Sequence, residues 1–225
     1  MLLMAHMLAL AVACLIFVWM IYLHRRARAA EKLSGNFRFI HPSFPQRPVS
    51  WLAVRSRDRQ VVQAALESTG LKPRNHKWFI APPVNGWTIV AGPGLPNPGD
   101  DVDECFHFLT ALSRTLGHVQ FFHAEKVLHH HAWARMDDGC VTRAYAWAGE
   151  TIWNQGCKTV LEIQLRLKCF HYGEAGGAWE TAELTASNVE KVPLLAAHWS
   201  IDPGKINELL AAGDGNGADE SSQFY

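Results

Sequence analysis

The sequence predicts an α+β fold, in which an antiparallel sheet carries helices on one face and one N-terminal transmembrane helix precedes the domain. Three observations predict it. Residues 2–23 form an uncharged apolar run, which as a helix rising about 1.5 Å per residue is long enough to cross a bilayer. From residue 50 onward, short β-rich runs alternate with helical patterns. A clear hairpin pattern then follows these elements.

The basic residues after the apolar run predict its orientation. Arg25, Arg26, Arg28 and Lys32 follow the run, and nothing basic precedes it. Because basic flanks stay on the cytoplasmic side, we expect the N-terminus outside and the soluble domain in the cytoplasm. A cleaved signal peptide is the alternative, since residues 27–29 have a small-x-small pattern. Signal peptides, however, carry their charge before a shorter apolar run.

Composition divides the chain into four parts. These are a transmembrane anchor (1–24), a basic juxtamembrane segment with a proline-rich linker (25–49), a soluble α+β domain (50–211) and a disordered tail (212–225). Proline makes the linker a semi-rigid extended spacer, and the glycine- and acid-rich tail cannot bury enough apolar surface to fold. The linker also holds several phenylalanines, so we expect part of it to pack on the domain.

Charge and cysteine content exclude some classes of function. The chain has 21 Lys and Arg against 21 Asp and Glu, so it has no basic excess to neutralise phosphates, and nucleic acid is a poor partner. The five cysteines form no CxxC pair and are interpreted as free thiols of a reducing compartment. The lipid bilayer, through residues 2–23, is the first predicted partner.

The first half of the domain is predicted to follow the ferredoxin-like order of strand, helix, strand, strand, helix and strand. Asp58 can cap the first helix, and Asp101 with Glu104 forms a capping box for the second. Asn85 and Gly86 are a strong turn signal. The expected elements are strands 51–55, 78–81, 87–91 and 118–122 and helices 58–69 and 101–116.

The second half adds a β-hairpin to this βαββαβ core. Its turn is predicted at residues 137–139, where two aspartates precede a glycine. Thr159 and Glu162 form another capping box, which opens a further helix. The expected elements are strands 130–136, 141–147 and 152–156, a helix at 159–170, a loop at 173–188, a helix at 189–199 and a short helical segment ending at 210.

Several short segments resemble a family of uncharacterised bacterial proteins. The resemblance is carried by tryptophan-containing segments at 86–92, 130–135, 145–150, 153–156 and 196–203. It implies a bacterial source, so that the membrane would be the bacterial inner membrane. It implies no activity, cofactor or site residue.

Histidines clustered before the hairpin are candidate metal ligands. In an extended chain alternate side chains share a face, so His129 and His131 would lie together, with His123 arriving from a neighbouring strand. Three imidazoles could hold a metal with one position open, and Glu125 is the nearest acid that could orient a ligand. No HExxH spacing occurs. We therefore favour structural or surface histidines and assign no metal.

Other catalytic patterns are weak. Cys157 lies near a predicted helix start, which favours a thiolate, but nothing positions a base beside it. No GxSxG elbow is present. The glycine-rich loop at 92–101 lacks the Gly-Lys-Ser/Thr ending of a P-loop, and its prolines remove amide donors. We assign no catalytic residue and no cofactor.

Four tryptophans are candidates for a partner-binding surface. Tryptophan is enriched among the residues that dominate binding energy at protein interfaces. The candidates are Trp87, Trp133, Trp147 and Trp153. The alternative is that these indoles fill the space between sheet and helices, each donating one hydrogen bond.

The sequence favours a membrane-anchored protein that works by protein–protein binding, as an accessory or scaffolding subunit of a membrane complex. A single span without polar relay residues argues against transport by this chain alone. Two alternatives stay open. One is a histidine-dependent, metal-assisted hydrolase, and the other is an immunity-type protein that binds a toxin.

Overall fold

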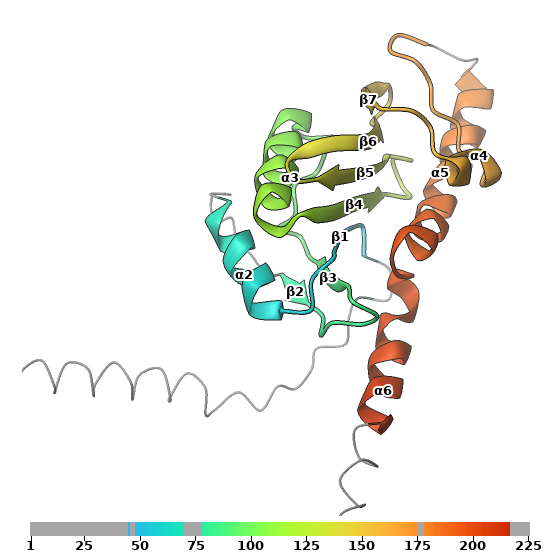
Figure 1. Ribbon diagram of the computed structural model, residues 1–225. Coiled ribbons are helices and arrows are strands. Elements are labelled where there is room, and N and C mark those ends of the chain that lie inside the picture. Colours follow the sequence, from blue (N-terminus) through green and yellow to red (C-terminus); the bar gives the residue numbers. More distant parts are fainter. Residues whose placement is uncertain (1–44, 46–47, 70–77, 175–177, 217–225) are drawn as a thin grey trace, which may run out of the picture. The chain divides into compact units, whose positions relative to one another are not determined.

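The computed structural model describes residues 45, 48–69, 78–174 and 178–216 (Figure 1). The predicted anchor, nearly all of the predicted linker and the end of the predicted tail lie outside the described residues. Among the residues described, none of the helices combines the length and the apolar character that crossing a bilayer requires.

The described residues form an α+β domain around a seven-stranded antiparallel sheet with strand order β2-β3-β1-β4-β5-β6-β7 (Figure 1). This class and the antiparallel pairing confirm the prediction. The strands are β1 (Ser50–Val54), β2 (Phe79–Ile80), β3 (Thr88–Ala91), β4 (His118–Ala124), β5 (His131–Asp137), β6 (Cys140–Trp147) and β7 (Thr151–Gln155). The helices are α2 (Arg59–Ser68), α3 (Val102–Leu116), α4 (Val160–Gln164), α5 (Ala178–Trp199), the 3₁₀ helix η1 (Pro203–Lys205) and α6 (Ile206–Asn216).

Both faces of the sheet are buried. In β1, Leu52 and Val54 belong to a first core cluster under α2 and α3, whereas Trp51 and Ala53 belong to a second cluster under α5. Figure 1 shows α2 and α3 on one side of the sheet and α5 on the other. The prediction of helices on one face is therefore wrong. The chain after the hairpin supplies a second helical layer, and this explains why β1 is apolar at successive positions rather than alternating.

The predicted caps fix the ends of α2 and α3. Asp58 Oδ1 accepts hydrogen bonds from the backbone N–H groups of Gln60 at 2.8 Å and Val61 at 3.2 Å. Asp101 Oδ1 accepts one from Glu104 N at 2.9 Å. These bonds satisfy amide donors that have no partner inside the helix. The two helix starts are therefore confirmed.

Two tight turns confirm the predicted hairpins. Asn85 and Gly86 have φ values of 51° and 83°, and Asp138 and Gly139 have φ values of 48° and 82°. Consecutive residues with positive φ match the right-handed twist of the strands that such turns join. The second turn joins β5 to β6 in the register Asp137↔Cys140.

The chain after β7 differs from the prediction in three places. The helix expected at 159–170 ends at Gln164, and Arg166 has a φ of 53°. The loop expected at 173–188 becomes helical from Ala178, within α5. The tail expected to be disordered from residue 212 continues α6 to Asn216. For α5, packing of Val192, Leu195 and Ala196 against the second face of the sheet overrides local composition.

Candidate binding site

A pocket of about 460 Å³ lies where the chain enters β1 and passes α5. This volume is in the range of ligand-binding cavities. It opens at the margin of the second core cluster, to which Trp51 belongs. The apolar part of its lining is formed by Pro48, Val49, Trp51, Val189, Pro193 and Pro203.

Local hydrogen bonds hold the walls of the pocket. Ala124 donates its N–H to the carbonyl oxygen of Val49 at 2.8 Å, which extends the pairing of β1 with β4 beyond the end of β1. The Glu125 carboxylate then accepts the N–H groups of Val127 at 3.0 Å and Leu128 at 2.7 Å. These two bonds hold the turn that follows β4, where Glu125 and Lys126 line the pocket.

Trp51 brings an unpaired donor to this site. Its side chain is 1% exposed, and its ring stacks on Phe122 with a centroid distance of 5.3 Å. The indole Nε1 is buried, and no described residue accepts a hydrogen bond from it. A buried donor without an acceptor costs about 1–3 kcal/mol.

Pro193 interrupts the regular hydrogen bonding of α5 beside the pocket. It lies inside α5 and lines the pocket together with Val189. Proline has no N–H, so the carbonyl of Val189, four residues earlier, lacks its ordinary helical donor.

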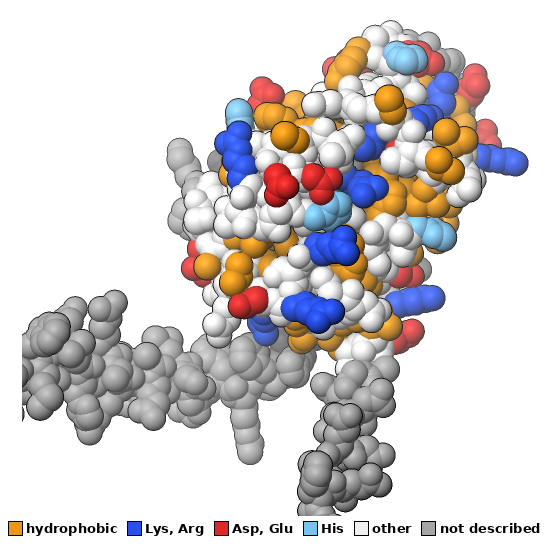
Figure 2. Space-filling view, in the orientation of Figure 1, with side chains coloured by type: hydrophobic (Ala, Val, Ile, Leu, Met, Phe, Trp, Pro, Cys, Tyr) orange, Lys and Arg blue, Asp and Glu red, His pale blue; other side chains and the backbone are white. Residues whose placement is uncertain are grey.

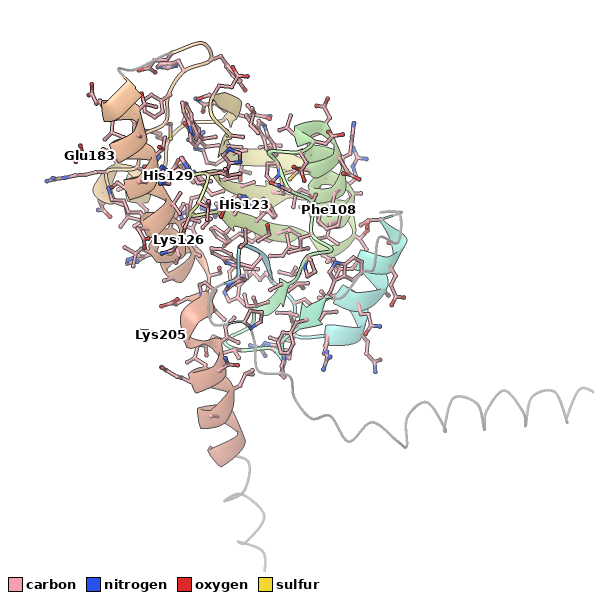
Figure 3. The ribbon with its side chains drawn as sticks, turned by 180° about the vertical axis from the view of Figure 1, so that it is seen from behind. Phe108, His123, Lys126, His129, Glu183 and Lys205 are labelled. Carbon is pink, nitrogen blue, oxygen red and sulfur yellow. The ribbon has the colours of Figure 1, made fainter. Side chains whose placement is uncertain are left out.

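The charged residues of the pocket are mostly acidic. Glu125, Glu190 and Asp202 supply three carboxylates, and Lys126 supplies one ammonium. Lys126 Nζ lies 2.5 Å from Glu190 Oε1, and Figure 3 shows Lys126 beside α5. Backbone hydrogen bonds from Leu128 and Val127 lower the pKa of Glu125 below its usual value. The mouth of the pocket is therefore negatively charged at neutral pH.

The structure buries three of the four tryptophans predicted to contact a partner. Trp133, Trp147 and Trp153 are 0%, 6% and 8% exposed. Trp133 Nε1 donates to Glu162 Oε1 at 2.9 Å, as expected of an indole that fills a core. Trp87 is half-buried and meets His118 edge-on. Among the four, Trp87 is the candidate for a partner surface.

The three histidines predicted as fallback metal ligands do not converge. His123 pairs with Ala132 across β4 and β5, so it shares a face with Ala132 and lies opposite the neighbouring His131. His123 Nδ1 lies 2.8 Å from Ser50 Oγ, whereas His131 Nε2 lies 3.0 Å from Asn188 Nδ2. No group of three metal-ligating side chains occurs within the described ranges.

The remaining histidine of the triplet, His129, lies in the connection between β4 and β5 with a φ of 56°. His131 Nδ1 lies 3.0 Å from its carbonyl oxygen. Burial lowers the pKa of both His123 and His131 to about 4. These two imidazoles are therefore neutral at physiological pH and act as hydrogen-bonding core residues.

A buried ion pair forms the strongest polar cluster of the second face. Arg143 and Glu162 are 2% and 0% exposed at their side chains, and Arg143 Nη2 lies 2.8 Å from Glu162 Oε1. Thr159 donates both its N–H and its hydroxyl to Glu162 Oε2, completing the predicted capping box. Arg143 lowers the pKa of the Glu162 carboxyl, although burial alone would raise it. Every oxygen of Glu162 is thus engaged, which indicates a structural role.

A second ionisable pair lies at the other end of β4. His118 Nδ1 contacts the Asp137 carboxylate, and His118 Nε2 lies 2.9 Å from Gln120 Nε2. The His118 side chain is 17% exposed. A carboxylate on Nδ1 fixes the imidazole tautomer, as in a catalytic dyad. Among the described residues, no serine or cysteine forms a hydrogen bond with the His118 imidazole.

The described cysteines are free thiols. Burial raises the pKa of Cys105 well above its usual value, and it raises the pKa of Cys169 to about 11. Cys157, the weak nucleophile candidate, is exposed. A raised pKa disfavours the thiolate that nucleophilic catalysis needs.

The sequence alone does not reveal the pocket. Trp51 is the first residue of a predicted strand, and its burial comes from α5, which joins it from residues far along the chain. One signal was available: Pro193 stands inside the predicted helix 189–199. A proline inside a helix has no N–H to donate to the carbonyl four residues earlier, and it therefore predicts a local irregularity in the helix.

Comparisons with known proteins give no match. No family model, curated protein or solved structure matches the chain. The chemistry of the pocket therefore rests on the residues that line it.

Proposed function

We propose that the chain is a single-pass bacterial membrane protein that acts by protein–protein binding, as an accessory or scaffolding subunit of a membrane complex. In this proposal residues 2–23 anchor it in the inner membrane, with the N-terminus outside and the domain in the cytoplasm. The observation that carries the binding role is the pocket of about 460 Å³ with its largely apolar lining.

The position of the pocket in the chain supports this role. Pro48 and Val49 line it, and they are the last two residues of the basic and proline-rich linker. A partner held in the pocket would therefore be close in sequence to the anchor. Figure 2 shows charges of both signs interspersed with hydrophobic side chains on the face it presents. This face has no extended basic patch of the kind that phosphate binding uses.

The proposed architecture is a ferredoxin-like core with additions. The order β2-β3-β1-β4, with α2 and α3 packed on one face, supports a βαββαβ core. β5 and β6 would be the added hairpin, extended by β7. α5 would cover the face that such a core leaves open, and the pocket would lie where core and addition meet.

Photo-crosslinking tests the binding role. A benzoylphenylalanine at position 49 of the full chain in its native membranes should give a discrete adduct with one protein, in a fixed stoichiometry. The control position is 61, because Val49 and Val61 are 48% and 47% exposed and Val61 lies on α2. Equal adduct patterns at both positions, or none at position 49, would contradict the proposal.

The alternatives lead to different outcomes. An immunity-type protein would give an adduct with a toxin rather than with a membrane complex. A histidine-dependent hydrolase is favoured by one observation, the contact of His118 with Asp137. It predicts that His118→Ala abolishes hydrolysis while the position-49 adduct persists. A metal-assisted version through His123, His129 and His131 is not supported, since His123 and His131 face opposite sides of the sheet.

A further inference from the structure

We propose that α4 and the chain around it rest on the anionic headgroup surface of the membrane that holds the anchor. The inference rests on the proposed membrane attachment, and it adds a second, peripheral contact between the domain and lipid. Two features carry it: the outward apolar face of α4 and the cations that flank this face. Together they form the α4 patch, whose members are Val160, Ile163 and Leu194 with the cations Lys158, Arg166 and Lys191.

The polarity of α4 is the reverse of that of an ordinary surface helix. Its one charged residue, Glu162, is buried in the ion pair described above, whereas Val160 and Ile163 are 71% and 62% exposed. Other residues make the inward apolar contact, since Leu161 and Leu165 pack against the second core cluster. A surface helix normally turns its polar residues to water. Apolar side chains on its outer side therefore indicate that another apolar phase covers them.

The exposed apolar surface continues from α4 onto α5. Lys191 of α5 donates its Nζ to the Arg166 carbonyl oxygen at 3.3 Å, just after the end of α4, and Figure 1 shows the two helices side by side. Leu194 is 50% exposed and follows Lys191 by three residues. Residues at this spacing are neighbours on a helix surface. The patch therefore spans parts of both helices.

The cations of the patch are not neutralised by neighbouring acids. Lys158, Arg166 and Lys191 form no ion pair with a described acid. The nearby Glu174 and Glu190 are each already paired with another lysine. Near an anionic membrane surface each free cation strengthens binding about fivefold. Three cations do not make an extended basic surface, so the apolar side chains must share in the binding.

A bilayer fits this patch better than a protein partner does. A stable protein–protein interface takes about 20–30 residues on each side, whereas the patch offers a few apolar side chains and their flanking cations. Interfacial membrane binding uses this combination of apolar area and attraction to anionic lipid. The linker, residues 25–49, can span at most about 80 Å, which keeps the domain near the membrane but leaves its orientation free. A weak patch is then enough to select the side that faces lipid.

Spin-label accessibility tests the contact with the bilayer. The full chain is placed in lipid nanodiscs that contain phosphatidylglycerol, and a nitroxide is attached at Ile163→Cys in a Cys140→Ser, Cys157→Ser background. The same background without Ile163→Cys measures the signal of the remaining thiols. We expect the label to collide more often with oxygen, which concentrates in lipid, than with a water-soluble nickel chelate. Val61→Cys on α2, which is also an exposed apolar position, should show the opposite order.

Charge variants identify the lipid chemistry. Arg166→Gln with Lys191→Gln removes two cations of the patch and should weaken its partitioning into lipid about 25-fold. Arg55→Gln with Arg57→Gln removes two exposed cations that follow β1 and should leave the label at position 163 in lipid. Nanodiscs of phosphatidylcholine alone should leave this label in water. Equal accessibility in the two lipids, or equal effects of the two double variants, would overturn the proposal.

The remaining outcomes separate this inference from the proposed function. If alkaline carbonate releases the chain from its native membranes, the anchor and this inference are both wrong. If the chain is retained but the label at position 163 stays in water, the anchor stands and the inference is wrong. If the label is shielded from both reagents in native membranes, a protein covers the patch, and the lipid proposal is overturned.

Discussion

At the scale of single residues, the domain concentrates its polar chemistry in groups that are buried and bonded. Arg143 is the clearest case, because its guanidinium also donates to the Ala144 carbonyl at 2.8 Å and to Asn154 Oδ1 at 3.0 Å. Charges that leave water must recover their solvation through such bonds. The buried indole Nε1 of Trp51 differs from these groups, because it has no hydrogen-bond partner among the described residues.

Removing the charge of Glu162 should therefore be costly. Glu162→Gln leaves Arg143 as an uncompensated buried cation, and we expect the free energy of unfolding to fall by about 3–5 kcal/mol. Urea unfolding of the full chain in micelles measures it. Glu174→Gln is the control, because Glu174 pairs with Lys168 at the surface and should matter little. A comparable loss in both variants would contradict the structural role of the buried pair.

The buried histidines make stability depend on pH. The pKa of His123 and of His131 is about 4 in the folded chain, against about 6.5 in an unfolded one. The unfolded state binds more protons between these values, so stability is present above pH 6.5 and is lost as the pH falls toward 4. Each histidine contributes about 3 kcal/mol to this loss.

Urea unfolding at pH 7 and at pH 5 measures the effect above the usual pKa of the carboxylates. His131→Gln should reduce the difference between the two pH values, because one titrating group is gone. If the free energy of unfolding of His131→Gln fell between pH 7 and pH 5 as much as that of the unmodified chain, His131 would not contribute to the pH dependence.

At the scale of elements, capping and turn residues predicted where helices begin and where hairpins turn. The extent of the later helices depends instead on packing between residues distant in sequence. The side chains of Asp58 and Asp101 accept hydrogen bonds from backbone N–H groups only two or three residues later. Such short-range caps can therefore be recognised from the sequence. α5 could not be predicted this way. Asn188 lies in the stretch expected to be a loop, yet its side chain bonds the backbone of Lys168 at 3.0 Å and 2.7 Å and His131 at 3.0 Å. These partners are distant in sequence, and they stabilise the helix in place.

The end of β7 shows a similar long-range constraint. Gly156 has a φ of 77°, and a Cβ there would lie 2.4 Å from the Thr142 carbonyl oxygen. Gly149 has a φ of 83° with nothing within 4 Å. Replacing either glycine by alanine forces a side chain into a positive-φ conformation, which costs free energy. Only at Gly156 would the new Cβ also clash with backbone atoms.

Gly156→Ala should therefore lower the free energy of unfolding by at least about 1 kcal/mol more than Gly149→Ala. Thermal or urea unfolding of the two variants, side by side, measures the difference. Equal losses would mean that β6 moves freely to accommodate the methyl group.

At the scale of the whole molecule, two helical layers enclose the sheet, and the pocket lies where the later layer meets the start of the domain. Three of the four tryptophans proposed for binding serve to fill these layers. The sequence showed a concentration of aromatic residues but could not divide it between core and surface, because that division depends on α5.

The orientation of the domain can be tested with its own thiols. Cys140 and Cys157 are exposed, so a membrane-impermeant maleimide should label them in inverted inner-membrane vesicles and not in intact spheroplasts. A Cys140→Ser, Cys157→Ser double variant should lose the label in the vesicles. Labelling in spheroplasts would contradict a cytoplasmic domain.

The central claim is that the chain works by holding a partner in the pocket beside Trp51. The amount of partner that co-purifies with the full chain after gentle detergent extraction, quantified by mass spectrometry for Val49→Arg and Val61→Arg, tests it most directly. We predict that Val49→Arg retains about a tenth of the partner or less and that Val61→Arg retains all of it. Equal recovery from both variants would contradict the account.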